Sequence, residues 1–198
     1  MLKILLLFKG ECTMMHIENR ILPYGPNFLG TIERNSETYI TIHESSDGTG
    51  FATPDRTIEY YENRLKNPPE GVNSKIGYHF MVDGDRLVQF IPLKYRTAHA
   101  GSTEGNHSIA IERLVNCNVD FPSAIANQAK LAATLMTMFG IPLDHVVPHK
   151  YWSGKACPSR LLAGMYGGWD GFIAQVKKFY TDHDIFNVEE ITFDLPRE

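Results

Sequence analysis

Apolar and polar positions alternate along several segments with the two-residue period of a β-strand. Residues 39–43 alternate in this way, are rich in β-branched side chains and end on a histidine. Residues 76–82 and 86–91 predict two further strands, joined by the Asp-Gly-Asp sequence of residues 83–85, which is typical of a hairpin. Another strand is predicted over residues 108–114.

Other segments space their apolar residues three and four positions apart, as helices do. A helix is predicted to begin at residues 53–55, where a threonine cap precedes a proline and an acid, and to end at residues 67–69. The longest helix, residues 122–139, ends at Gly140, and a final amphipathic helix covers residues 169–179. Strands interleaved with helices indicate a sheet covered by helices on at least one face.

The composition is that of a chain with a full hydrophobic core. Of its 198 residues, 43% are hydrophobic and 21% are charged, which excludes a disordered or low-complexity chain. The net charge of −4, without a basic run, gives no electrostatic footprint for nucleic acid or an anionic membrane. No apolar stretch approaches the ~20 residues of a membrane-spanning helix. The odd set of widely spaced cysteines, Cys12, Cys117 and Cys157, argues against a disulfide scaffold and for a reducing compartment.

We expect one domain, residues 21–180, between a leader and a tail. The leader, residues 1–20, holds an apolar run that is shorter than the core of a secretory signal. Synthesis in the cytoplasm without a clear signal peptide is therefore expected. The tail, residues 181–198, is dominated by acidic residues and is too short to form a second domain.

Two histidines and a cysteine stand at places where chemistry is plausible. His43 ends a predicted strand, and His149 and Cys157 lie eight residues apart in a loop of glycine, proline and polar residues. Two imidazoles and a thiolate suit Zn²⁺, and three protein ligands leave a fourth position for water. Taken singly, each residue more often has a structural role, and the spacing is not that of a close-set zinc motif. Cys157 could instead be a nucleophile with His43 or His149 as its base.

Lys155 and Glu112 are candidates for electrostatic and acid–base roles. Lys155 precedes Cys157 by two residues, so it could favour a thiolate, hold negative charge on a substrate oxygen, or be a solvated surface lysine. Glu112 shares one face of its strand with small residues and is either paired with a cation or poised as a base. Its neighbour Arg113 points to the opposite face, so a salt bridge to another residue is the simpler account of Glu112 taken alone.

Three ring side chains near these positions have open roles. Tyr78 and His79 alternate along a predicted strand, so only one of them can face a given site. His99, in a Thr-Ala-His-Ala-Gly segment, could support a ligand, contact a substrate or be a capped loop residue.

Several stretches of the chain carry a resemblance to a known family. They are residues 40–43, 77–80, 98–101, 106–112 and 147–158, of which the last is long and specific. From residue 39 to about residue 180, the chain resembles the zinc-dependent N-acetylmuramoyl-L-alanine amidases of the type-2 amidase and peptidoglycan-recognition-protein superfamily. It is most similar to the endolysins and autolysins of Gram-positive bacteria and their prophages.

The resemblance implies an α/β fold in which a central mixed β-sheet is flanked by helices, with a zinc cleft on one side of the sheet. It assigns His43, His149 and Cys157 as ligands of one Zn²⁺ per chain. It gives Glu112 the place of the general base and Lys155 that of the oxyanion stabiliser. Some branches of the family use a catalytic tyrosine at the position of Tyr78, but this chain has the glutamate, so that tyrosine is expected to be supporting. The supporting or substrate-binding candidates are Tyr78, His99, Asn106 and Trp152.

The function implied by the resemblance is hydrolysis of the amide bond between the lactyl group of N-acetylmuramic acid and the first L-alanine of the stem peptide. Some relatives bind peptidoglycan without cutting it and lack the third ligand, so a binding module is the alternative, and a cysteine peptidase is a more distant one. We expect a monomer that acts on the bacterial cell wall, released at lysis or secreted, without a nucleic-acid partner. The family often continues into a wall-binding module, so this chain either finds the wall without one or is the catalytic part of a longer protein.

Overall fold

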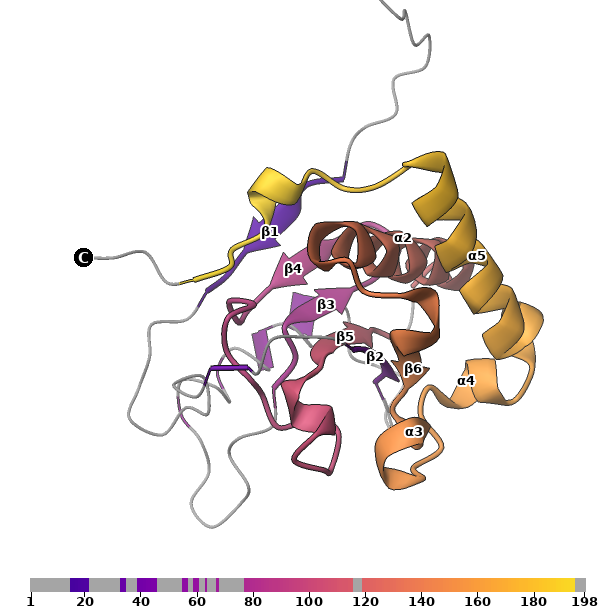
Figure 1. Ribbon diagram of the computed structural model, residues 1–198, viewed down its shortest axis with the longest axis horizontal. Helices are drawn as coiled ribbons and strands as arrows, with labels where there is room; N and C mark the ends of the chain where they lie inside the picture. Colours follow the sequence, from indigo (N-terminus) through magenta and orange to yellow (C-terminus); the bar gives the residue numbers. More distant parts are fainter. Residues whose placement is uncertain are drawn as a thin grey trace, which may run out of the picture.

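A mixed β-sheet with helices packed on it forms the centre of the described chain (Figure 1). The structure is a computed structural model that describes residues 15–21, 33–34, 39–45, 55–56, 59–60, 63, 67, 77–115 and 119–194. In spatial order the six strands are β1 (Ile17–Asn19), β4 (Leu87–Gln89), β3 (Phe80–Val82), β5 (Ile109–Arg113), β2 (Ile40–Glu44) and β6 (Val146–Pro148). The expected α/β fold with a central mixed sheet is confirmed.

The strands that matter for the site run parallel. β2 pairs in parallel with β5 on one side and with β6 on the other, and β5 also pairs in parallel with β3. β4 is antiparallel to β3, and β1 is parallel to β4, so these two strands run the opposite way. Parallel strands end at one edge of a sheet, which is where ligands bind in open α/β folds. The residues at the ends of β2, β5 and β6 therefore meet at this edge.

The main core lies between one face of the sheet and two long helices. α2 (Phe121–Phe139) lies across this face, and α5 (Gly168–Asp182) packs against α2 (Figure 1). The apolar residues that β2 and β5 contribute to this core are fully buried and are all isoleucines, Ile40, Ile42, Ile109 and Ile111. Because side chains alternate along a strand, the intervening residues of β2 and β5 point to the opposite face. That face carries the polar residues considered below.

The longest helix ends as predicted, and it begins with a side-chain cap that the sequence analysis did not identify. The side chain of Asp120 accepts a hydrogen bond from the Ser123 N–H at the start of α2. At the other end, Gly140 adopts a left-handed conformation, with φ of 65°, that a side chain would disfavour. No helix among the described residues has both the length and the apolar character needed to cross a membrane.

The predicted hairpin is confirmed, although its strands are shorter than predicted. β3 and β4 pair antiparallel, and the Asp83 carboxylate accepts hydrogen bonds from the N–H groups of Asp85 and Arg86, at 2.8 and 2.7 Å. The helix predicted from residue 53 is helical at residues 55–56, 59–60 and 63. Residue 67, at the predicted end, is described and is not helical, and its N–H donates to the carbonyl of residue 63 at 2.8 Å. The remaining residues of the predicted helix, together with the first and second cysteines of the chain, lie outside the described residues.

Both ends of the domain differ from the expected boundaries. Residues 17–19, which were expected in the leader, form β1 and pair with β4. In the expected acidic tail, Phe186 and Ile191 are buried in the main core, and the Leu93 N–H donates to the Thr192 carbonyl at 3.1 Å. The acidic residues dominate the composition of this segment, but the apolar residues between them decide where it packs. The folded unit therefore includes residues on both sides of the expected limits.

We predict that Phe186→Ala lowers the free energy of unfolding by about 3 kcal/mol, because a buried aromatic ring leaves a cavity when it is removed. Val188→Ala, at an exposed position of the same segment, should change it by less than about 0.5 kcal/mol. Urea unfolding followed by circular dichroism measures both values. Equal, small effects of the two substitutions would show that this segment is not part of the core.

Candidate metal centre and catalytic site

His43 occupies the end of a central buried strand. It is the fourth residue of β2, which is enclosed by β5 and β6, and its side chain is buried on the face opposite the isoleucine core. Its Nε2 lies 2.9 Å from Nδ1 of His99. In the tautomer in which Nε2–H donates to His99, Nδ1 of His43 is free, and it lies 4.0 Å from the Cys157 sulfur.

His149 follows β6 directly and is brought to His43 by strand pairing. Its N–H donates to the Ile42 carbonyl at 3.2 Å, which extends the pairing between β6 and β2 by one residue. The ring centroids of His43 and His149 are 4.7 Å apart. The His149 ring also hydrogen-bonds the backbone of Ala100, whereas its Nδ1 is buried without a hydrogen-bond partner. A buried nitrogen without a partner is costly unless a ligand completes it.

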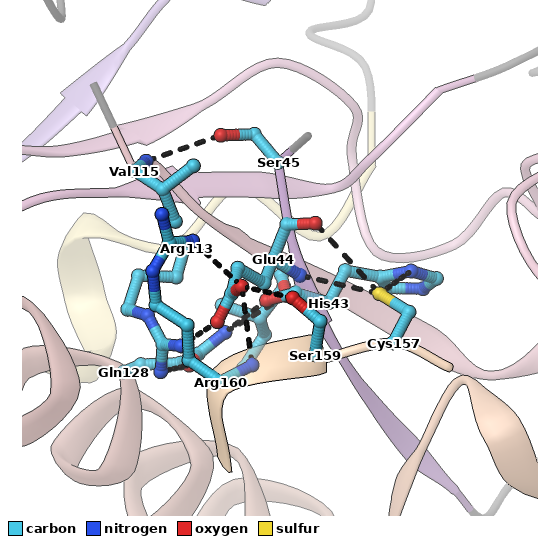
Figure 2. Close-up of polar contacts among 10 residues, drawn as sticks. His43, Glu44, Ser45, Arg113, Val115, Gln128, Cys157, Ser159 and Arg160 are labelled. Atoms are coloured by element: carbon cyan, nitrogen blue, oxygen red, sulfur yellow. Dashed lines mark hydrogen bonds and ion pairs between the residues drawn. The ribbon is translucent and has the colours of Figure 1, made fainter. Parts of the chain in front are cut away.

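Cys157 returns to the same place after one short helical turn. α3 (Lys150–Ser153) ends at Gly154, whose φ of 74° reverses the chain, and the Lys150 N–H donates to the Cys157 carbonyl at 3.1 Å. The Cys157 sulfur is buried beside the His43 ring (Figure 2). The ligand atoms of His43, His149 and Cys157 all lie within 4.8 Å of one another. The structure thus brings together the three residues that were expected to bind metal.

Burial keeps the three candidate ligands uncharged in the absence of a cation. It lowers the pKa of His43 well below the ordinary value and also lowers that of His149, and the positive charge of Lys155 adds to both shifts. Burial likewise raises the pKa of the Cys157 thiol to about 11, although the Glu44 N–H opposes this shift. Neutral imidazoles can bind a metal without losing a proton, and a bound cation reverses the effect of burial on a thiol.

Glu112 faces the same side of the sheet as His43 and is its direct neighbour in the register of β5 and β2. The side chain is buried, and its Oε2 has no hydrogen-bond partner. Burial raises the pKa of Glu112 to about 8, whereas Lys155 and a hydrogen bond with Tyr78 lower it. No ion pair joins Glu112 to a cation in the described part of the chain; Arg113 pairs with Glu44 on the opposite face. The arrangement favours a poised base over the salt-bridge account.

The choice between Tyr78 and His79 is settled by their contacts. The Tyr78 ring approaches the His43 ring at 5.2 Å between centroids. His79 faces elsewhere, because its Nδ1 accepts a hydrogen bond from the Ala110 N–H at 3.0 Å and its Nε2–H donates to the Tyr95 carbonyl at 2.8 Å. Tyr78 therefore lies at the candidate site, and His79 is a buried structural residue.

A cavity of about 680 Å³ opens beside the candidate metal centre. Its lining includes His149, Tyr78 and the exposed Lys155, together with the loop of residues 98–106. Lys155 therefore reaches the cavity, as expected for a group that contacts a substrate. The cavity lies on the face of the sheet that α2 leaves open, which agrees with the expected cleft.

The other supporting candidates are placed mainly by contacts within the protein. Asn106 lines the cavity, and its side-chain oxygen accepts hydrogen bonds from the N–H groups of His99 and Ala100, at 2.9 and 3.0 Å. Trp152 donates through Nε1 to the Thr41 hydroxyl at 2.8 Å and is not among the residues that line the cavity. Asn106 thus orders the loop that carries His99, and Trp152 holds α3 against β2.

The sequence patterns assigned no role to Glu44, which contacts both Cys157 and Arg113. The only feature of the sequence that could have indicated a role for Glu44 is its position next to His43.

The profile of the family described as N-acetylmuramoyl-L-alanine amidase matches residues 33–160. The chain belongs to this family. The match contains all three candidate ligands as well as Glu112 and Lys155, so the residues that meet at the sheet edge lie within the part of the chain that defines the family.

Individual relatives agree with the family and with the fold. The chain is 39% identical over 141 residues to the N-acetylmuramoyl-L-alanine amidase XlyA of Bacillus subtilis (strain 168), a match covering 70% of this chain and 43% of XlyA. It is 35% identical over 139 residues to CwlH of the same organism, covering 68% of this chain and 51% of CwlH. A solved mutant endolysin from Bacillus subtilis is 36% identical with a TM-score of 0.69, covering 82% of this chain and 99% of that structure. The chain thus spans about half the length of the curated relatives.

We predict that acid destabilises the metal-free protein because four buried imidazoles, those of His43, His79, His99 and His149, have lowered pKa values. In the unfolded chain each imidazole binds a proton near its ordinary pKa, about 6.5. The free energy of unfolding therefore falls as the pH drops below about 6.5, by up to about 1.4 kcal/mol per pH unit for each imidazole. The raised pKa of Glu112 acts in the opposite sense between about pH 4.5 and 8 and offsets one imidazole in part.

Urea unfolding in the presence of a chelator between pH 5 and 7.5 measures this dependence. His79→Gln can retain both hydrogen bonds of His79 without its titration, so its slope below pH 6.5 should be shallower by about 1.4 kcal/mol per pH unit. A wild-type stability that is constant or rises toward pH 5 would contradict the prediction.

Proposed function

We propose that this chain is a zinc-dependent peptidoglycan hydrolase that cleaves the amide bond between the lactyl group of N-acetylmuramic acid and L-alanine of the stem peptide. The proposal rests on one observation above all: two imidazoles and a thiol converge within 4.8 Å, beside a buried carboxylate, in a chain of the N-acetylmuramoyl-L-alanine amidase family. The names of XlyA and CwlH supply the bond that is cut.

The residues present fit a zinc ion. The ligands would be His43, His149 and Cys157, and the buried Nδ1 of His149 lacks a partner that a metal would supply. A donor set of two nitrogens and one sulfur leaves one of four tetrahedral positions for water or substrate. When bound, zinc lowers the pKa of its water toward ~7 and polarises the scissile carbonyl. We propose one Zn²⁺ per chain.

Glu112 acts as the general base in this proposal. Its carboxylate accepts a proton from the attacking water and later delivers it to the leaving amine, because an amine leaves poorly without a proton. A pKa raised to about 8 by burial suits both transfers near neutral pH. Tyr78 supports this role through its hydrogen bond to Glu112.

Lys155 supplies positive charge where the carbonyl oxygen becomes negative. It is exposed at the cavity that also reaches His149, so a substrate in the cavity can contact both residues. A fixed charge stabilises the tetrahedral oxyanion more than the neutral carbonyl, which favours the transition state. His99 and Asn106 line the cavity as further candidates for substrate contact.

The two alternatives fit the site less well. A binding module does not need a third metal ligand or a buried base, yet Cys157 and Glu112 are both present. A cysteine peptidase needs a thiol with a lowered pKa, whereas burial raises the pKa of Cys157 to about 11. We further propose that the chain acts on the bacterial cell wall as a monomer and has no nucleic-acid partner.

We predict that the purified chain binds about one zinc ion and that chelation abolishes amide cleavage, because activation of the water depends on the metal. Elemental analysis gives the zinc content. New N-terminal alanine on digested cell walls, together with mass spectrometry of the fragments, identifies the bond that is cut. Full activity of a metal-free sample would end the zinc proposal, and binding to walls without new alanine termini would favour the binding module.

Glu112→Gln should keep the fold and bound zinc but slow turnover by roughly 10²-fold or more, the usual contribution of a general base. Single-turnover release of N-terminal alanine measures the rate, and elemental analysis checks the metal. Tyr78→Phe is the matched variant: it removes the hydroxyl that contacts Glu112 and should slow turnover less. A wild-type rate in Glu112→Gln, with a large loss in Tyr78→Phe, would transfer the role of base to Tyr78.

A further inference from the structure

Behind the candidate metal centre, on the helix-covered face of the sheet, lies a largely buried polar cluster formed by Glu44, Arg113, Gln128 and Arg160 (Figure 2). Glu44 follows His43 on β2, so its side chain points away from the face that carries the metal ligands. Its carboxylate is only 1% exposed and the Arg113 side chain is fully buried. The proposed mechanism uses none of these side chains.

The Glu44 carboxylate joins two separate parts of the chain. One oxygen accepts a hydrogen bond from the Arg113 guanidinium, which comes from β5. The other accepts from the Ser159 hydroxyl and from the Arg160 guanidinium, each at 2.8 Å, and from the Arg160 N–H at 3.4 Å. Ser159 and Arg160 begin α4 (Ser159–Leu162), which starts two residues after Cys157. The Glu44 carboxylate thus links the start of α4, which follows Cys157, to β2, which carries His43.

The backbone of Glu44 also contacts the Cys157 sulfur directly. The Glu44 N–H donates to Sγ at 3.4 Å, and the protonated thiol donates to the Glu44 carbonyl at 3.7 Å. Sγ therefore lies between the two backbone polar groups of the residue next to His43 (Figure 2). A shift of α4 relative to β2 would move the sulfur away from His43.

Gln128 extends the cluster to the backbone of the site. Its side-chain oxygen accepts a hydrogen bond from Arg113 at 3.1 Å, and its amide donates to the carbonyls of His43 and Ile111, at 2.9 and 3.1 Å. The cluster accordingly contacts the backbone of one candidate ligand, the backbone beside Glu112 and the helix that follows Cys157. Buried ion pairs add little net stability, so we assign this cluster a role in geometry rather than in stability. Both carboxylate oxygens of Glu44 are hydrogen-bonded, whereas the Nε of Arg113 is buried without a hydrogen-bond partner.

We infer that Glu44 is a positioning residue for the metal centre, whose carboxylate, held by Arg113 and Arg160, keeps Cys157 within ligand distance of His43. This inference rests on the proposed zinc site but not on the bond that the enzyme cuts. Residues that orient metal ligands typically contribute a factor of about 10 to 100 in metal affinity. Loss of this carboxylate should therefore weaken zinc binding even though it does not touch the metal.

The test measures zinc affinity of the full chain by competition with a chromophoric chelator. Glu44→Gln keeps the shape of the side chain but removes its charge, and we expect the affinity to fall by about 10- to 100-fold. Cobalt substitution gives a second measure, since thiolate-to-cobalt absorption reports whether the sulfur still coordinates the metal. We expect this band to weaken or shift in Glu44→Gln.

Arg160→Gln separates positioning from simple electrostatics. It removes a positive charge near the site, so Coulomb's law alone would strengthen the binding of a divalent cation. Loss of the contact to Glu44 should instead weaken binding, by about tenfold. Arg160 is 34% exposed and Arg113 still neutralises Glu44 in this variant, so the fold is less at risk than in Glu44→Gln. Arg160→Lys, which keeps a cation, should recover part of the loss.

Phe186→Ala serves as the control for lower stability, because it removes a buried core side chain that is not a member of the cluster. Under conditions where circular dichroism shows all variants folded, this control should bind zinc with wild-type affinity. The inference is overturned if Glu44→Gln keeps the wild-type affinity and cobalt spectrum, if Arg160→Gln binds zinc more tightly, or if the control loses as much affinity. If the wild type binds zinc but releases no N-terminal alanine from cell walls, the proposed function fails while these affinities still decide the role of Glu44.

Discussion

The parallel pairing of β2 with both of its neighbours is the constraint on which the site depends. In the register with β5, His43 lies beside Glu112; in the register with β6, Ile42 lies beside Pro148, so His149 emerges next to His43. A shift of one residue on either side would turn one of these groups into the isoleucine core. The isoleucines that pack against α2 therefore fix the register, and the register fixes the distances between the polar groups on the other face.

Burial then determines the charges of the site. The candidate ligands and the candidate base are buried, so the imidazoles stay neutral, the thiol stays protonated and the pKa of Glu112 rises to about 8. Such a site is incomplete by itself, with unpaired polar atoms on His149 and Glu112. A divalent cation is the kind of partner that resolves this state, since it stabilises the thiolate and occupies the free nitrogen. In the proposed function, a bound metal offsets the cost of burying these groups.

Periodicity was enough to predict the larger elements but not the small ones that place the ligands. The 3.6-residue spacing and end signals of α2 predicted it to within a residue, and alternation predicted β2 and β5. β6 has only three residues and lies in a proline-containing segment, so it offered no pattern, although it positions His149. At both ends of the domain, short segments contain apolar residues that pack in the main core. Their position near the chain termini, and the acidic composition of the C-terminal segment, led the sequence analysis to place them outside the domain. Residue types and loop context singled out His43, His149 and Cys157 only as candidates, and the resemblance assigned them as ligands. Residues as distant as His43 and Cys157 share no spacing that a single sequence can reveal.

The alternation of side chains along β2 and β5 also links the two faces of the sheet. His43 and Glu112 lie on the face of the sheet that carries the candidate metal centre, while the next residue on each strand, Glu44 and Arg113, lies on the helix-covered face and pairs there. Each strand therefore carries a candidate residue for the proposed chemistry and, one position later, a residue that contacts the surrounding elements. Because the peptide units between them are shared, a displacement of the charged pair must also rotate the backbone that aims His43 and Glu112. In this fold, the polar residues on the helix-covered face are thus part of the geometry of the site rather than a separate contribution to stability.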